Sequence, residues 1–394
     1  MTTPNEIFQL SKKYSDYTAN NLSELIKTKS LSNQEENVVK LIKKMMLEAG
    51  FDEARIDGLG NVIGKIGNGP KVIAIDGHVD TVDAGNISNW EFDPFGGEIK
   101  NGYVLGRGTV DQKSGVASFI SAGKIMKEIG LPNDLSVYFT GSIIEEDCDG
   151  LCWKYIIEEE GIKPECVIIT EPTDLNIYRG QRGRMEMEVV FKGISSHGSA
   201  PERGKNAIYM GSRVALKIEE LNERLKVDNF LGKGTIAVTE FKSDSPSLCA
   251  VSDYARFHLD RRLTWGENEE LALSQINELL KDYDAQVRTL DYKITTFTGK
   301  EYGMKKYFPT WVIEESHPVI TKGIDCYKKL FNSEPLVDKW TFSTNGIAIN
   351  GMHNIPIIGF GPGEEKMAHS PNEKVPVEHL VKAAAFYAQY CLHY

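Results

Sequence analysis

The ten residues KVIAIDGHVD (71–80) decide how the rest of the sequence is read. They begin as a short apolar run, typical of a strand buried on both faces in a parallel sheet. The run ends in Gly77, His78 and Asp80, so polar side chains follow the strand directly. His78 and Asp80 stand two positions apart and therefore share one face of an extended segment. The segment predicts a buried strand with functional groups at its carboxyl end.

Buried strands and amphipathic helices alternate in the first and last thirds of the chain. Apolar runs that end in polar residues recur at 135–146, 166–173 and 354–363. Helical periodicity occupies 33–50, 114–130 and 376–392. Strands that alternate with helices of this length predict an α/β domain with a mostly parallel sheet.

The middle of the chain follows another pattern. In 184–195, apolar and charged side chains alternate, as in an antiparallel strand with one solvated face. Helices are expected at 206–225 and 267–283, and strands at 234–243, 252–263 and 285–294. The order strand-helix-strand-strand-helix-strand predicts a smaller α+β domain of ferredoxin-like type. We therefore expect residues 182–297 to be inserted into a discontinuous larger domain built from 1–181 and 298–394.

The composition narrows the class of protein. A chain of 394 residues exceeds one compact core, and 26% charged residues is ordinary for a globular protein. A formal net charge of −11 argues against binding to a nucleic acid. No apolar run reaches the roughly 18 residues of a membrane span, and residues 1–13 lack the apolar core of a signal peptide. We expect a cytoplasmic protein with reduced cysteines.

Five places in the sequence carry side chains suited to chemistry, and each ends a strand or lies in a loop beside one. They are His78 with Asp80, Asp111 in GRGTVDQKSG (106–115), the pair Glu145-Glu146, Glu171, and His369 in GFGPGEEKMAHSPNE (359–373). A single carboxylate or histidine at such a place is usually a solvated residue, a helix cap or a packed imidazole. Together they supply two imidazoles and several carboxylates at the sheet edge where α/β domains bind ligands. That mixture suits zinc, and cobalt or manganese less distinctively.

Whole motifs of the sequence resemble the zinc aminoacylase/carboxypeptidase family (M20), which includes succinyl-diaminopimelate desuccinylase and acetylornithine deacetylase. The motifs are GHVDTV (77–82), GRGTVDQKSG, IIEED (143–147), ITEPT (169–173) and AHSPNE (368–373). Within the family they look closest to the YgeY-type hydrolases. The resemblance implies a catalytic α/β domain with an inserted lid and dimerisation domain, and a reaction in which water cleaves a carbon–nitrogen bond.

The resemblance also implies a centre of two divalent metal ions, which would be zinc, or else cobalt or manganese. One ion would be held by His78, Asp111 and Glu171. The second would be held by Asp111, Glu146 and His369. Asp111 would then bridge the two ions and share its charge between them.

Two further carboxylates of these motifs are implied to act beside the metal ions. Asp80 would accept the second ring N–H of His78 and so fix its tautomer. Glu145 would be the general base that moves the proton from water to the leaving nitrogen. Because its neighbour Glu146 is committed to a metal and adjacent side chains of an extended strand diverge, Glu145 can point at the water.

The inserted domain would contribute residues to the substrate. His197, in GISSHGSAPERGKNAI (193–208), has the context of a surface loop, but the resemblance implies that it stabilises the oxyanion, often in the partner subunit's site. Asn206 would help to line the closed site. Arg262, in LDRRLTWGE (259–267), would bind a substrate carboxylate in a bidentate manner.

Some positions depart from the family pattern or keep two interpretations. DCDG (147–150) follows the Glu pair where the family has a Gly-rich stretch, which leaves specificity at this loop open. Cys148 within it is not needed as a ligand, because the carboxylate and imidazole set is complete. A cis peptide bond is expected at Asp111–Gln112. Arg182 and Arg184, at the expected domain junction, suit interdomain ion pairs as well as substrate contact.

The leading hypothesis is a dinuclear hydrolase that cleaves an amide-type C–N bond in a small N-acyl or N-carbamoyl amino acid. An exopeptidase or dipeptidase would use the same metal apparatus, and the sequence does not separate the two. A non-catalytic binding protein is disfavoured because no ligand or base is missing, and a serine hydrolase because a G-x-S-x-G elbow is absent. The expected partners are a small-molecule substrate and a second copy of the chain, paired through the inserted domain.

Overall fold

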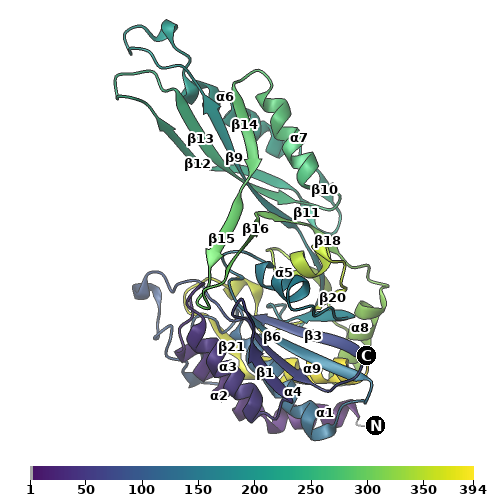
Figure 1. The fold of residues 1–394 in the computed structure, drawn as a ribbon. Coiled ribbons are helices and arrows are strands. Elements are labelled where there is room, and N and C mark those ends of the chain that lie inside the picture. Colours follow the sequence, from purple (N-terminus) through teal and green to yellow (C-terminus); the bar gives the residue numbers. More distant parts are fainter. Residues whose placement is uncertain (1–2) are drawn as a thin grey trace.

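The protein is seen in a computed structural model that describes residues 3–394. Figure 1 shows a broad layered domain that holds both termini and a narrower domain that stands on it. Each domain has its own hydrophobic core, and the core of the small domain draws its buried residues from 185–280. The mixed α/β architecture with a smaller second domain confirms the fold class expected from the sequence.

A nine-stranded sheet forms the centre of the large domain. Its strands are β1 (Glu53–Ile56), β2 (Val62–Ile66), β3 (Lys71–His78), β6 (Leu135–Ser142), β7 (Cys166–Ile169), β8 (Ile177–Gln181), β18 (Trp311–Val312), β19 (Val337–Trp340) and β20 (Ile357–Gly359). Their order is β1-β2-β6-β3-β7-β20-β8-β18, and β19 pairs with β8. The central strands β6, β3, β7 and β20 are parallel, whereas β1, β2, β8 and β18 pair antiparallel at the margins. Four neighbouring strands at the centre are therefore parallel, and the site residues follow these strands, while β19 adds one parallel pair with β8 at the margin.

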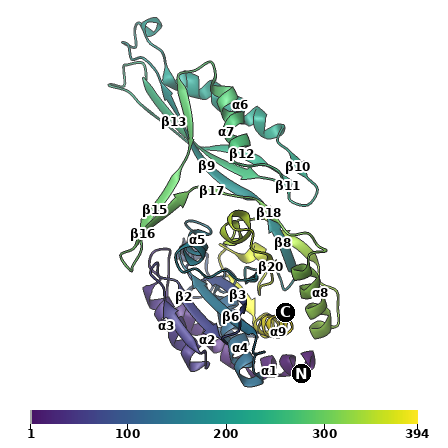
Figure 2. The same ribbon diagram turned by 45° about the vertical axis from the view of Figure 1, so that its right-hand side comes forward.

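Helices cover both faces of this sheet. They are α1 (Pro4–Lys13), α2 (Ser15–Lys27), α3 (Glu36–Glu48), α4 (Lys113–Ile129), α5 (Leu151–Glu158), α8 (Pro318–Phe331) and α9 (Val377–Leu392), with short turns η1 (Ile87–Asn89), η3 (Ile347–Met352) and η4 (Glu365–Met367). In Figures 1 and 2, α1, α2, α4 and α9 lie together on one face, and α5 lies on the other, toward the small domain. Among residues 3–394, no helix is long and apolar enough to cross a membrane.

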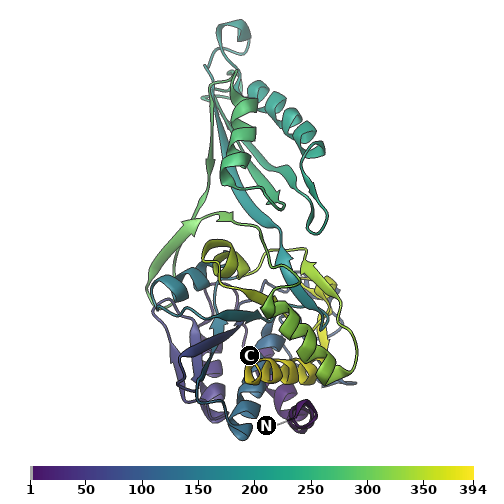
Figure 3. The ribbon, with the colours of Figure 1, turned by 90° about the vertical axis from the view of Figure 1, so that its right-hand side faces the viewer.

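The small domain is a sheet covered on one face by two helices. Its elements are β9 (Gly183–Lys192), β12 (Thr235–Asp244), β13 (Tyr254–Leu263), β14 (Ala285–Thr289), β17 (Tyr307–Phe308), α6 (Ala207–Glu223), α7 (Glu269–Leu280) and the turn η2 (Pro201–Arg203). The strand order is β12-β13-β9-β14, and β17 also pairs with β9. Met185, Met187 and Val189 are buried while the residues between them are half-buried, as the period of two predicts. Figure 3 shows both helices on one side of this sheet.

A hairpin of β15 (Asp291–Thr295) and β16 (Glu301–Lys305) departs from the sequence expectation. The sequence predicts one strand over 285–294 and an insertion that ends at 297. Instead, the strand breaks at Leu290, and the side chains of Tyr292, Ile294 and Phe297 pack against the core of the large domain. Alternation of apolar and polar residues fits a strand in either domain, so the pattern alone could not place this segment.

The two domains also touch through a short hairpin of the small domain, β10 (Val227–Asp228) and β11 (Gly232–Lys233). Phe230 at its tip lies against the large domain. The guanidinium carbon of Arg179 is 3.9 Å from the centre of the Phe230 ring, and Lys339 Nζ is 5.2 Å from it. These cation–π contacts help to hold the small domain over the ends of the central strands.

A small sheet fixes the loops near the site. It consists of β4 (Ile99–Lys100), β5 (Tyr103–Leu105) and β21 (Lys374–Pro376), in the order β21-β5-β4. Because β5 leads into the loop of Asp111 and β21 follows the loop of His369, their pairing brings the two loops together.

The stacking of Phe360 on Phe386 gives a test of the large core. Both rings are fully buried and their centres lie 3.8 Å apart, where α9 packs under the sheet. We expect Phe386→Ala to lower the free energy of unfolding of the large domain by about 3–5 kcal/mol, because it leaves a cavity. Urea denaturation followed by circular dichroism measures this. Leu47→Ala, at an exposed position of α3, is the control and should change it by less than ~1 kcal/mol.

Candidate metal centre

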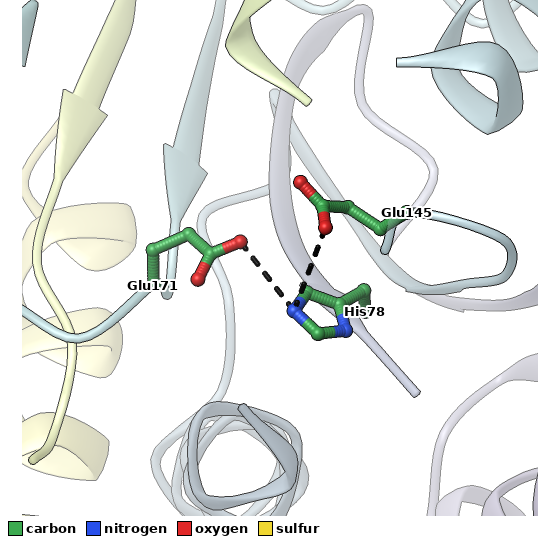
Figure 4. Close-up of side chains that lie close together, drawn as sticks. All are labelled: His78, Glu145 and Glu171. Atoms are coloured by element: carbon green, nitrogen blue, oxygen red, sulfur yellow. Dashed lines mark ion pairs between the residues drawn. The ribbon is translucent and has the colours of Figure 1, made fainter. Parts of the chain in front are cut away.

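The candidate site lies at the carboxyl ends of the central strands, beneath the small domain. His78 is the last residue of β3, Glu145 and Glu146 follow β6, Glu171 follows β7, Asp111 precedes α4, and His369 lies in the loop after β20. Parallel strands present their carboxyl ends at one edge of the sheet, which brings these residues together although they are far apart in sequence. Figure 4 shows His78, Glu145 and Glu171 with their side chains turned toward one another.

Asp111 stands between the two histidines. His78 Nε2 lies 2.8 Å from Asp111 Oδ1, and His369 Nε2 lies 3.2 Å from Asp111 Oδ2. His369 Nε2 is also 2.9 Å from Glu146 Oε2, and His78 Nε2 is 3.6 Å from Glu171 Oε1. The structure therefore brings together all five residues that the sequence proposes as metal ligands, and one oxygen of Asp111 faces each histidine. The Asp111–Gln112 peptide bond is cis, as expected.

Glu145 is also within this cluster. Its Oε2 lies 3.9 Å from His78 Nε2, and its side chain is almost fully buried. Donor atoms of His78, Glu145 and Glu171 lie within 4.8 Å of one another, and so do those of His78, Asp111 and Glu146. Cys148 is fully buried and belongs to neither of these groups.

The contact between Asp80 and His78 differs from the sequence expectation. His78 Nδ1 is 2.9 Å from the backbone carbonyl oxygen of Asp80, which accepts its N–H, while the carboxylate Oδ1 is 3.6 Å away. The Asp80 carboxylate instead accepts the backbone N–H groups of Glu145 and Glu146, each at 3.1 Å. The result for the imidazole is the same: Nδ1 carries a proton that the carbonyl oxygen accepts, and Nε2 faces the cluster.

Glu35, in the segment 33–50 for which the sequence predicts only a helix, supports the backbone next to the cluster. Its fully buried Oε1 accepts the backbone N–H groups of Asn33 at 2.9 Å and Ile144 at 3.1 Å. Ile144 has a φ of 60°, a conformation that is costly for a β-branched residue and needs support from its surroundings. Glu35 and Asp80 together hold three successive N–H groups, those of 144–146, and so aim Glu145 and Glu146. Hydrogen bonds to the backbone leave no signal in the sequence.

Three carboxylates of the cluster, those of Glu145, Glu146 and Glu171, have too little positive charge around them. Burial raises the pKa of Glu145 and of Glu171 well above its usual range, and that of Glu146 to about 7. Glu145 Oε1 and Glu171 Oε2 are buried and lack a hydrogen-bond partner among the described residues. Buried carboxylates in this state either carry protons or bind a cation.

The two histidines respond to the same negative charge. Burial opposes the charged form of His78, but the carboxylates of Glu171 and Asp111 outweigh it and raise its pKa well above the usual range. Hydrogen bonds with Asp111 and Glu146 raise the pKa of His369 to about 10. Divalent cations would replace these protons and satisfy the orphaned oxygens, so the residues present fit a centre of one or two metal ions.

A cavity of about 600 Å³ opens above the cluster, between the two domains. Its lining residues are Asp111, Glu145, Glu146, Asp149, Glu171, Arg184, Arg262, Thr341, Phe342, Ser343, Glu365, Lys366, Ala368 and His369. The small domain contributes Arg262, whose Nε and Nη2 donate to the carboxylate of Asp260 at 2.7 and 3.0 Å. It also contributes Arg184, whose Nη2 is 3.5 Å from Asp149 Oδ1. Arg182 instead donates to the carbonyl oxygen of Lys233, so the two arginines of the junction have different surroundings.

His197 and Asn206 are not brought to this cavity within one chain. β9 starts at the domain junction with Gly183 and runs ten residues away from it, so the loop that follows lies roughly 30 Å beyond the junction. In that loop, the backbone of His197 pairs with that of Ala250 in an isolated antiparallel β-bridge. Asn206 caps α6, and its Oδ1 accepts the N–H of Ile208 at 2.9 Å.

Comparisons with known proteins agree with this geometry. The model described as "Peptidase family M20/M25/M40" matches residues 74–393. The chain is 49% identical over 384 residues to the uncharacterized protein YgeY of Escherichia coli K12, covering 97% of this chain and 95% of YgeY. It is 24% identical over 379 residues to a succinyl-diaminopimelate desuccinylase of Cereibacter sphaeroides, covering 93% and 95%. The resemblance predicted from the motifs is confirmed.

The fold is shared with solved structures as well. The Bacillus subtilis YXEP protein, a dinuclear metal-binding peptidase from the M20 family, superposes with a TM-score of 0.71 at 15% sequence identity. The match covers 97% of this chain and 98% of that protein. Similarity at this level of identity shows a common fold.

The raised pKa values in the cluster predict that the metal-free protein becomes less stable to unfolding as pH rises. In the folded protein, the pKa of Glu146 is about 7 and that of His369 is about 10. Both pKa values lie above the usual pKa of the group. Their contribution to stability is therefore complete at low pH and is lost as pH rises through these values. We expect the melting temperature of the metal-free protein to fall between pH 6 and pH 9, as measured by differential scanning fluorimetry after chelation.

The control for this prediction is the Glu146→Gln variant, which removes one of the titrating groups and should weaken the decline around pH 7. A saturating divalent cation should raise the melting temperature and flatten the profile, because it takes the place of the protons. A melting temperature that rises from pH 6 to pH 9 in the metal-free protein would contradict the proposed charge state of the cluster.

Proposed function

Because the chain belongs to peptidase family M20/M25/M40 and is a metallohydrolase, we propose that it cleaves an amide-type C–N bond in a small N-acyl or N-carbamoyl amino acid at a dinuclear metal centre. The observation that carries this proposal is the position of Asp111 between His78 and His369, with the buried carboxylate of Glu145 beside them.

We assign His78, Asp111 and Glu171 to one ion, and Asp111, Glu146 and His369 to the other. Imidazole and carboxylate donors suit zinc, so zinc is the proposed metal. When bound, the ions would polarise the scissile carbonyl and lower the pKa of water in the site.

Glu145 is the proposed general base. The hydrogen bond from its own N–H to Asp80 holds its backbone, while its Oε1 is free of partners among residues 3–394. The carboxylate takes a proton from the attacking water and delivers it to the leaving nitrogen. Its raised pKa in the metal-free protein follows from burial among Asp149, Glu171 and Glu146.

The small domain is proposed to recognise the substrate and to close over it. Arg262 and Arg184 are cross-strand partners on β13 and β9, and both line the cavity. Two guanidinium groups beside a metal centre favour a substrate with a carboxylate, to which an arginine can donate two parallel N–H bonds. A similarity of 24% identity to a desuccinylase is consistent with an acylated amino acid. Domain closure would exclude water from the cavity.

Screening of the metal-loaded protein tests the substrate class. Panels of N-acyl amino acids, N-carbamoyl amino acids and dipeptides should give turnover with one of the first two. The fold shared with YXEP, a peptidase, favours the dipeptides as the alternative. Turnover confined to peptides would establish that alternative and reject the first.

We also propose a homodimer that forms through the small domain. β12 is an edge strand of its sheet, and Tyr209, Leu216 and Phe241, on α6 and β12, are exposed apolar residues. An open strand edge next to apolar side chains suits pairing with a second copy. Such pairing would carry His197 and Asn206 of one chain toward the cavity of the other.

The six cysteines are all free thiols, which supports a cytoplasmic location.

The role of Glu145 is tested by the variant Glu145→Gln. We expect it to bind metal as the wild type does and to lose at least about 100-fold in kcat, because proton transfer is removed while the ligands remain. Metal content and steady-state kinetics on the substrate found by screening measure both. The matched variant Glu146→Gln should lose metal as well as activity. Near-normal turnover by Glu145→Gln would reject the assignment.

The role of His197 across a dimer is tested by mixing two inactive variants. His197→Ala and Glu145→Gln chains, unfolded and refolded together, should recover roughly a quarter of wild-type activity, because half of the dimers are mixed and each contains one complete site. If His197 acts within its own chain, the mixture stays inactive. Leu216→Glu, which places a charge at the proposed interface, should give a monomer in analytical ultracentrifugation and abolish the recovery.

A further inference from the structure

A buried ion pair lies directly under the loop that carries Asp111. Arg107 Nη1 donates to Glu373 Oε2 at 2.6 Å, and the two side chains are 3% and 0% exposed. The guanidinium carbon of Arg107 also lies 5.2 Å from the centre of the Trp90 ring. Removal of either partner of such a pair is strongly destabilising, because it leaves a buried charge without compensation.

The Glu373 carboxylate has a second set of contacts, with the backbone of the Asp111 loop. Its Oε1 accepts the N–H groups of Gly108 at 3.1 Å, Val110 at 2.6 Å and Asp111 at 3.1 Å. One side chain therefore binds three N–H groups of the segment that presents the bridging ligand. Charge-assisted hydrogen bonds of this kind are stronger than neutral ones.

Glu373 also belongs to the loop that carries His369, four residues earlier. Its own carbonyl oxygen accepts the N–H of Gly106 at 2.9 Å, and the pairing of β21 with β5 continues from there. The two loops are thus joined at Glu373 by main-chain and side-chain bonds together. This junction sets how far the backbone of His369 lies from the backbone of Asp111.

His369 depends on this junction more than His78 does. The ring of His78 is buried and is held from behind by the carbonyl oxygen of Asp80. The side chain of His369 is 52% exposed, and within residues 3–394 its ring contacts only Asp111 and Glu146 as polar partners. Its position at the cluster is therefore a property of its loop.

We propose that Glu373 is a positioning residue for the metal centre, which holds the loops of Asp111 and His369 at the separation that the second ion requires. The inference rests on the proposed dinuclear centre and adds to it a residue outside the ligand set. Partners that orient metal ligands typically contribute on the order of 10–100-fold to metal affinity. The contribution of Glu373 should fall mainly on the ion held by His369, Glu146 and Asp111.

The test removes the backbone contacts without leaving a buried charge. Arg107→Met/Glu373→Leu takes away both charges and the acceptor of the three N–H groups. Arg107→Met/Glu373→Gln takes away both charges but keeps a carbonyl oxygen that can accept those N–H groups. We expect the Leu variant to bind the second ion about 10–100-fold more weakly than wild type. The Gln variant should stay within a few-fold of wild type.

A matched control comes from the small domain. Arg261 and Glu267 form a second pair with both side chains 1% exposed, joined at 2.6 Å, and Glu267 Oε2 accepts the N–H of Thr264 at 2.8 Å. Arg261→Met/Glu267→Leu makes the same chemical change in the other domain, at residues that do not line the cavity. It should alter the melting temperature but not the binding of metal.

The readouts are the number of ions bound and their affinities, from equilibrium dialysis against zinc with elemental analysis, and the melting temperature of each metal-free variant. If wild type binds fewer than two ions, both the dinuclear centre and this inference are overturned. If wild type binds two and the Leu variant binds both with unchanged affinity, only this inference fails, and it fails too if the control weakens metal binding equally. Should the Leu variant not fold, Glu373→Asp, which keeps the charge but withdraws the acceptor, must show the same weakening of the second ion.

Discussion

Negative charge gathered at the ends of parallel strands is the constraint on which the rest of this site depends. Asp111, Glu145, Glu146 and Glu171 line one cavity, and their mutual repulsion opposes the fold unless protons or cations offset it. The protein holds them in place by their backbones. Three other buried carboxylates accept backbone N–H groups at or beside these residues, and they belong to Asp80, Glu35 and Glu373. These hydrogen bonds fix the backbone that carries the carboxylates of the cluster.

The sequence predicted the parts of the site that follow from the sheet. His78, Glu146 and Glu171 could be placed together because each follows a buried strand, and parallel strands end at a common edge. Their roles as ligands came from the motifs, since a carboxylate at a strand end is usually solvated. What the sequence could not show were contacts between a side chain and a distant backbone, such as those of Glu35 and Glu373. A local pattern also could not assign the 291–305 hairpin to the large domain.

The small domain contributes residues to the cavity in a different way from the large domain. Within a single chain it brings Arg184 and Arg262 over the cavity, but it keeps His197 at the opposite end of its sheet. The length of β9 imposes this separation, because an extended strand cannot fold back on itself. In a single chain, His197 therefore lies away from the cavity that Arg184 and Arg262 line.

Two of the connections between the domains lie side by side. The N–H of Gly183, where β9 begins, donates to Thr310 Oγ1 at 3.0 Å, and Thr310 lies between β17 and β18. The β15–β16 hairpin and Phe230 of the β10–β11 hairpin join the domains at further points. Arg184 and Arg262, which line the cavity, belong to the small domain, whereas all the proposed metal ligands belong to the large domain. Contacts to a bound substrate would therefore depend on how the two domains are placed, whereas the proposed ligand set lies within one of them.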